Sequence, residues 1–126
     1  MTNVERANRW LDKTNETTAR MDTPKVLRKE EALEIVRRYK EIISPRFNGE
    51  IKVMMFGSYS KGNANPWSDI DVAVIVPKIE KDKWFDTSVL LGMDVDKVSL
   101  LIEPILLEQD EDSPIYREVM RTGIAA

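Results

Sequence analysis

The chain has 126 residues and a formal net charge of −3, and it contains neither cysteine nor histidine. The lack of cysteine excludes disulfides, thiolate zinc sites and cysteine nucleophiles, and the lack of histidine excludes a Ser-His-Asp triad and imidazole metal ligands. Any chemistry must therefore rely on carboxylates, hydroxyls, Lys, Arg and backbone groups. Carboxylates favour hard ions such as magnesium or manganese.

The charge pattern also narrows the classes of partner. The 19 basic and 22 acidic residues are interspersed along the chain. Proteins that bind long nucleic acids usually carry an excess of basic residues, so this pattern argues against such binding. No apolar run reaches the ~20 residues that a membrane span needs, and the first residues lack the apolar stretch of a secretion signal. We therefore expect one compact cytoplasmic domain.

Residues 1–22 are polar and contain neither Pro nor Gly. The spacing of Val4, Ala7 and Leu11 predicts a short amphipathic helix, which would form an N-terminal extension to a domain of residues 23–126. This helix would either dock loosely on the domain or offer a contact surface to a partner. The sequence leaves both interpretations open.

The first helix of the domain is predicted to begin at Thr23-Pro24, a helix cap followed by Pro at the first helical position. Apolar residues then recur at helical spacing from Val26 to Ile43. Ser44-Pro45 should end the helix, because proline disfavours a helical conformation in the residue before it.

The rest of the chain predicts three strands and two further helices. Strands are expected at 50–56, 69–76 and 98–107, with a polar loop at 57–68 that has room for one helical turn. A helix at 81–91 should bury Trp84, Phe85, Val89 and Leu90. A last helix at 115–121 should begin at Ser113-Pro114 and close at Gly123. This order indicates an α+β fold with helices packed on a small sheet.

Asp69 and Asp71 flank Ile70 at the start of the second strand. Alternate side chains of a strand share a face, so the two carboxylates should point the same way, about 6–7 Å apart. Two such carboxylates repel each other, and a bound divalent cation is the simplest compensation. Taken alone, the pair is also compatible with an exposed strand end or a turn cap.

Gly57-Ser58 directly follows the first strand. Glycine allows close backbone approach and positive φ, so this loop could direct N–H groups and the Ser58 hydroxyl at phosphate oxygens. Ser60, Lys61 and Asn63 lie in the same loop and would add donors and one positive charge. A plain turn is the alternative for Gly-Ser alone.

The combined run GSYSKGNANPWSDIDVAVIV resembles the nucleotidyltransferase superfamily related to DNA polymerase β. Within that superfamily it is similar to the minimal, MNT-type members. The specific match covers Met55 to Val76. The resemblance implies a mixed sheet with a polymerase β palm-like fold. It also implies magnesium-dependent transfer of a nucleoside monophosphate from a nucleoside triphosphate, with Ser58 on the triphosphate and Asp69 and Asp71 on two magnesium ions, for which manganese could substitute.

The family usually supplies a third carboxylate from a later strand. Some minimal members carry an Ile-Glu-Pro there, which matches Glu103, so Glu103 is assigned as the third catalytic and metal-binding acid. Many relatives instead carry an Asp early in that strand, where this chain has Ser99. Asp94 or Asp96 could substitute.

Three weaker candidates remain. Trp67 could line the nucleotide site, although an aromatic plug in the loop is favoured. Arg117 and Arg121 lie four residues apart and could bind phosphate, although a solvated helix face is favoured.

The resemblance also implies a partner. Minimal members often pair with a small helical HEPN protein in toxin–antitoxin modules, and some attach AMP from ATP to a tyrosine of that partner. The chain has no room for the acceptor-binding domain of larger relatives, so the acceptor site should come from a partner or a second subunit. The alternative is an inactive module with the same fold that regulates a partner by contact.

Overall fold

The computed structural model describes residues 25–126. The predicted N-terminal helix of residues 1–22 and the Thr23-Pro24 cap lie outside the described residues. Among the described residues, no helix is both long and apolar enough to cross a membrane.

Helix α2 spans Lys29–Ile43 and is followed by a 3₁₀ turn, η1, at Ser44–Phe47. The helix does not begin at Pro24 as predicted, because residues 25–28 are not helical. Its start is set instead by Glu31, whose carboxylate accepts a hydrogen bond from the backbone N–H of Arg28 at 3.0 Å. The predicted end at Ser44-Pro45 is confirmed.

Residues 25–126 form a sheet of four strands in the order β3-β2-β1-β4. Strand β1 (Lys52–Phe56) runs antiparallel to both β2 (Ile70–Val76) and β4 (Ile124–Ala125), and β2 runs parallel to β3 (Ile102–Glu108). The mixed α+β architecture is thus confirmed. The sequence did not reveal β4, which is too short to show a strand pattern and is held by neighbouring bonds such as Ala126 N–H to the Val53 carbonyl at 2.9 Å.

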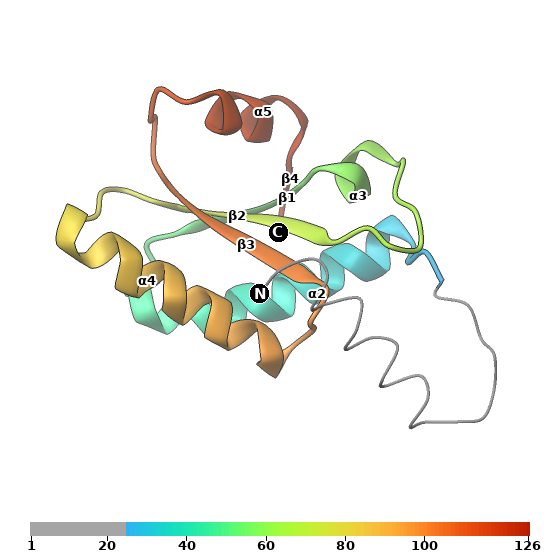
Figure 1. Ribbon diagram of the computed structural model, residues 1–126, viewed down its shortest axis with the longest axis horizontal. Coiled ribbons are helices and arrows are strands. Elements are labelled where there is room, and N and C mark those ends of the chain that lie inside the picture. The colour runs from blue at the N-terminus through green and yellow to red at the C-terminus, as the bar shows by residue number, and fades with distance from the viewer. Residues whose placement is uncertain (1–24) are drawn as a thin grey trace.

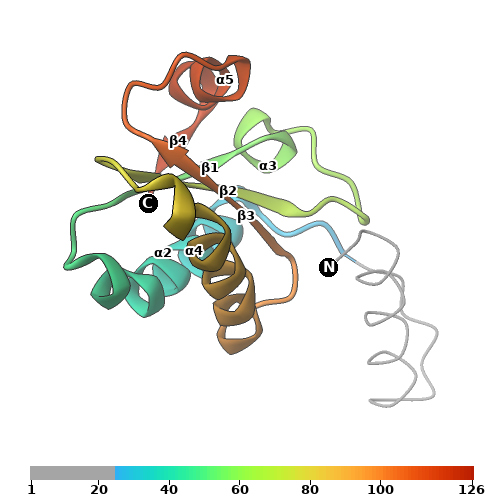
Figure 2. The same ribbon diagram turned by 60° about the vertical axis from the view of Figure 1, so that its left-hand side comes forward.

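Helices cover both faces of the sheet (Figures 1 and 2). Helix α2 and α4 (Lys81–Asp94) pack on one face, where β2 contributes the buried side chains Ile70, Val72, Val74 and Val76. The C-terminal helix α5 (Pro114–Thr122) packs on the other face through Tyr116 and Val119. The short helix α3 (Ser58–Lys61) lies on the same side as α5.

The predicted buried face of α4 is wrong for three of its four residues. Phe85 is 74% exposed, and Val89 and Leu90 are also exposed, whereas Leu91 is buried and Trp84 is half-buried. Residues 84 and 91 are two helical turns apart and face the sheet, on roughly the opposite side of the helix from residues 85 and 89. The helix carries apolar residues on both sides, so its sequence alone does not show which side is covered.

The predicted start of the third strand is also wrong. Residues 98–101 form a turn after η2 (Val95–Lys97), and β3 begins only at Ile102. Ser99 sets this turn: its N–H donates to the Val95 carbonyl at 2.9 Å, and its hydroxyl oxygen accepts the Leu101 N–H at 3.1 Å. Ser99 therefore does not occupy a strand position.

The predicted last helix is confirmed, with α5 beginning one residue earlier than expected. Pro114 occupies its first turn, and the Ser113 hydroxyl oxygen caps it by accepting the Tyr116 N–H at 3.2 Å. Helix α5 ends at Gly123. A Cβ there would lie 2.4 Å from the Val119 carbonyl oxygen, so the chain turns from helix to β4 where only glycine fits.

Candidate functional site

Asp71 and Glu103 lie next to each other on neighbouring strands. The sheet register pairs Phe56 of β1 with Asp71 of β2, and Asp71 with Glu103 of β3. Side chains in register point to the same face of a sheet, which here is the face that α5 covers farther along. Both carboxylates are half-buried. The fold therefore brings together two acids that are 32 residues apart in sequence.

Gly57 lies against Asp71. Its φ of +74° is in the region that favours glycine, and a Cβ built on it would stand only 2.1 Å from Asp71 Oδ2. No other amino acid fits here unless the carboxylate moves. The predicted Gly-Ser loop and the predicted acidic strand therefore meet at this glycine.

The loop after Gly57 is tied back onto it. The Ser60 hydroxyl donates to the Gly57 carbonyl at 2.9 Å, and the Lys61 N–H donates to the same carbonyl at 3.1 Å. The Asn63 N–H donates to the Ser58 carbonyl at 3.0 Å. Ser60 is buried, whereas Ser58 is half-buried and Lys61 and Asn63 are exposed. The hydrogen bond that the Ser60 hydroxyl donates therefore helps to fix the conformation of the loop.

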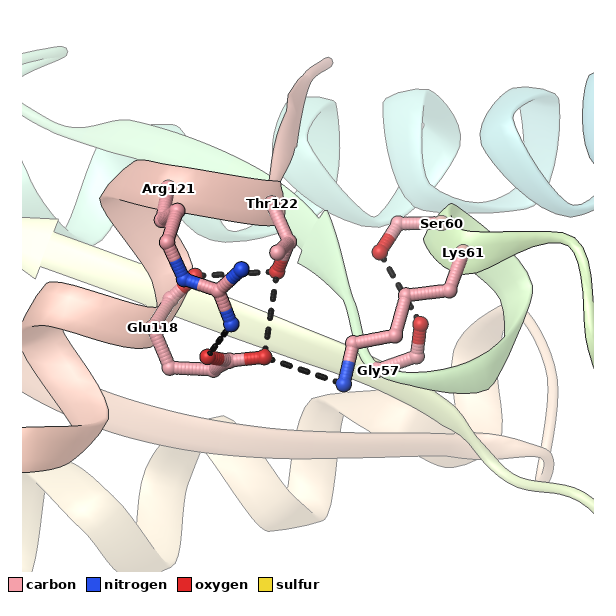
Figure 3. Close-up of polar contacts among 6 residues, drawn as sticks. All are labelled: Gly57, Ser60, Lys61, Glu118, Arg121 and Thr122. Atoms are coloured by element: carbon pink, nitrogen blue, oxygen red, sulfur yellow. Dashed lines mark hydrogen bonds and ion pairs between the residues drawn. The ribbon is translucent and has the colours of Figure 1, made fainter.

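Lys61 contacts α5. Its Nζ lies 2.9 Å from Glu118 Oε1, and the other oxygen of Glu118 accepts a hydrogen bond from Arg121 (Figure 3). Hydrogen bonds from Lys61 and Arg121 hold the pKa of the Glu118 carboxyl below its usual value. Glu118 is not among the residues predicted from the sequence, because no sequence signal places the middle of the last helix beside the loop.

Trp67 is not the loop plug favoured from the sequence. Its side chain is 59% exposed. The Asn65 side-chain oxygen accepts the Trp67 backbone N–H at 2.9 Å, and the Ser68 hydroxyl oxygen accepts the Asn65 N–H at 2.9 Å. These bonds shape the turn immediately before Asp69 and leave a large aromatic surface facing solvent.

Asp94 does not join the carboxylates on the sheet. It is buried on the helix side, where Arg46 Nε donates to its Oδ2 at 2.6 Å and Lys97 Nζ lies 2.9 Å from its Oδ1. The hydrogen bond from Arg46 is the main reason that the pKa of Asp94 lies below its usual value. Asp96 lies in η2, at the end of the same helix. Neither residue is in register with Asp71.

The donor chemistry at Asp69, Asp71 and Glu103 fits a hard divalent cation, because carboxylate oxygens are the ligands such ions prefer. Asp69 immediately precedes β2, whose first residue donates its N–H to the Leu101 carbonyl at 2.8 Å. Within residues 25–126, no three acidic side chains converge closely enough to hold a metal ion. A shared three-carboxylate metal site therefore stays a prediction.

Comparisons with known proteins identify the family of the domain. Residues 36–122 match the family model described as nucleotidyltransferase domain. The chain is 28% identical over 99 residues to "Putative protein adenylyltransferase MJ0141" of Methanocaldococcus jannaschii, and the match covers 75% of this chain and 97% of that protein.

One solved structure supports the same fold. A crystal structure described as a putative nucleotidyltransferase from Sulfolobus solfataricus superimposes with a TM-score of 0.56 at 20% identity, covering 82% of this chain and 90% of that one. A toxin–antitoxin structure with AMP-PNP matches at a TM-score of 0.44 and 20% identity, covering 79% of this chain and 72% of that one.

Proposed function

Because the chain belongs to the nucleotidyltransferase domain family, we propose that it transfers AMP from ATP to a hydroxyl group of a protein. The contact between Gly57 and Asp71, with Glu103 in register beside Asp71, is the observation that carries this proposal. It brings a loop suited to phosphate next to carboxylates suited to magnesium. The choice of AMP is supported by the name of the Methanocaldococcus relative.

On this proposal, the triphosphate lies against the loop of residues 57–68, here called the Gly57 loop. Gly57 lets the backbone come close to the ligand, Ser58 offers its hydroxyl, and Lys61 and Asn63 reach in from exposed positions. Ser60 contributes by holding the Gly57 carbonyl. Trp67 offers an exposed ring on which a nucleobase could stack.

Asp69, Asp71 and Glu103 would hold two magnesium ions. When bound, such ions lower the pKa of an attacking hydroxyl and neutralise charge that develops on the pyrophosphate leaving group. Glu103 is preferred as the third acid because it shares a sheet face with Asp71, whereas Asp94 is buried on the opposite side with Arg46.

The acceptor proposed is a tyrosine hydroxyl on a HEPN-type partner. This rests on the resemblance of the Met55–Val76 segment to minimal members of the family, and on the protein substrate named for the Methanocaldococcus relative. A second copy of the chain is the other protein acceptor to test. The net charge of −3 disfavours a nucleic-acid acceptor.

The experiment incubates the protein with magnesium, alone and together with a HEPN-type protein, using ATP labelled at either the α or the γ phosphate. We expect label from α-labelled ATP only, because AMP transfer retains the α phosphate. Asp71→Asn should lower the rate by at least about 10²-fold, since it removes the negative charge of a proposed magnesium ligand without changing side-chain volume.

Asp112→Asn is the matched control, because it removes the same charge from an exposed residue next to α5. Equal labelling by wild type and Asp71→Asn would refute the assigned role of Asp71. Label from the γ phosphate would indicate phosphoryl transfer instead. ATP binding without transfer to either acceptor would favour an inactive module that acts by contact.

A further inference from the structure

Glu118 of α5 forms an ion pair with Lys61, which carries the one charged group of the Gly57 loop that could bind a phosphate. The Lys61 ammonium lies 2.9 Å from Glu118 Oε1, and Arg121 binds the other carboxylate oxygen (Figure 3). The Thr122 hydroxyl donates to the Glu118 carbonyl at 2.9 Å. Two cations and one carboxylate leave this cluster with a net charge of +1.

A short chain of contacts connects this cluster to the carboxylates on the sheet. The Lys61 N–H donates to the Gly57 carbonyl at 3.1 Å, and Gly57 lies against Asp71. Helices α3 and α5 lie on the same side of the sheet, and the ion pair spans between them (Figures 1 and 3). The backbone of Lys61 is therefore one hydrogen bond away from the glycine that lies against Asp71.

The ion pair between Lys61 and Glu118 is weak enough for Lys61 to exchange Glu118 for another anion. The side chains are 42% and 30% exposed, and exposed ion pairs contribute little because water and salt screen them. A triphosphate carries several negative charges and forms short, charge-assisted hydrogen bonds with ammonium groups. A triphosphate within reach of Lys61 should therefore displace a single carboxylate.

We propose that Glu118 is the resting partner of Lys61, and that a bound nucleoside triphosphate takes Lys61 away from it. This rests on the proposed function, because it assumes that the triphosphate lies against the Gly57 loop. Arg121 remains on Glu118 after the exchange, so the released carboxylate keeps a cationic partner. Glu118 thus lowers the affinity for triphosphate and links α5 to occupancy of the site.

Isothermal titration of the full chain with ATP and magnesium tests the exchange. Glu118→Gln should bind ATP about two- to fivefold more tightly than wild type, which is the range expected for loss of one exposed ion pair. Asp112→Asn should bind ATP like wild type. It makes the same change in net charge, but the carboxylate that it removes pairs with Arg117 rather than Lys61. Thermal unfolding of each variant checks that it is folded.

A double variant separates the pair from a general charge effect. In a Lys61→Gln background, Glu118→Gln should no longer change ATP affinity, because the competing interaction is already absent. The same gain in that background would overturn the proposal, as would unchanged or weaker ATP binding by Glu118→Gln alone. If wild type and Glu118→Gln both fail to bind ATP, the proposed function fails together with the exchange. ATP binding without the predicted gain refutes the exchange only.

Discussion

Gly57 combines two constraints that are separable by mutation. Its backbone has φ +74°, and the space where a side chain would lie is filled by the Asp71 carboxylate. Gly49 has a φ of +75°, but no neighbouring atom lies within 4 Å of the position that a Cβ would take there. A side chain at either glycine would therefore be strained by the positive φ, and only at Gly57 would it also displace a residue of the candidate site.

We predict that Gly49→Ala loses about 1–2 kcal/mol of unfolding free energy, because it places a Cβ at positive φ. Gly57→Ala should lose more, about 3 kcal/mol, because its backbone, with φ +74° and ψ −151°, is in a region that almost only glycine adopts and its Cβ would also displace Asp71. Only Gly57→Ala should also weaken ATP binding, by at least about tenfold, since a displacement that costs about 1.4 kcal/mol has that effect. Urea unfolding and calorimetric titration measure the two quantities. Equal ATP affinity of the two variants would show that contact with Asp71 is not needed for binding.

At the scale of elements, local patterns predicted strands and helix ends wherever one signal dominated. The alternation that points Ile70, Val72 and Val74 away from Asp71 is present in the structure, as is the cap at Ser113. The pairing of Asp71 with Glu103 depends on how β2 and β3 align, which no local pattern specifies. The choice of Glu103 came instead from the likeness of Ile102-Glu103-Pro104 to the Ile-Glu-Pro of some minimal members of the family.

Two elements show where local patterns fail for physical reasons. The segment before β3 is rich in β-formers, yet Ser99 bonds its own backbone neighbours and delays the strand to Ile102. The contact of Glu118 with Lys61 joins residues 57 positions apart. Tertiary packing alone determines it, so the sequence pattern favoured a solvated face for Arg121 and gave no indication of Glu118.

Helix α4 gives the prediction that belongs to this scale. Leu91 is 1% exposed and Phe85 is 74% exposed, so Leu91→Ala should lower the unfolding free energy by about 2–5 kcal/mol. Phe85→Ala should change it by less than about 0.5 kcal/mol, because it removes little buried surface. Urea denaturation of both variants measures the difference. A larger loss for Phe85→Ala would mean that this face of α4 is covered in solution.

At the scale of the whole molecule, one ion cluster around the buried Asp94 joins segments that are distant in sequence. Asp94, at the end of α4, binds Arg46 of η1 through both carboxylate oxygens at 2.6 and 3.1 Å, and Lys97 contacts it at 2.9 Å. Nearby, the Tyr39 hydroxyl of α2 donates to the Leu91 carbonyl at 2.6 Å. These contacts hold α2, η1 and α4 together beneath the sheet, away from the carboxylates of the candidate site.

This cluster makes the free energy of unfolding depend on pH in the acidic range. Hydrogen bonds from Arg46 hold the pKa of Asp94 below its usual value, so its stabilising contribution is fully present above the unfolded-state pKa of about 3.9. It declines as pH falls through the lower folded-state pKa. Asp94→Asn should therefore lose about 1–3 kcal/mol at pH 6, where Arg46 loses its charged partner. The gap to wild type should narrow below pH 4 in urea titrations run from pH 2.5 to 7, and a constant gap would show that charge at Asp94 does not matter.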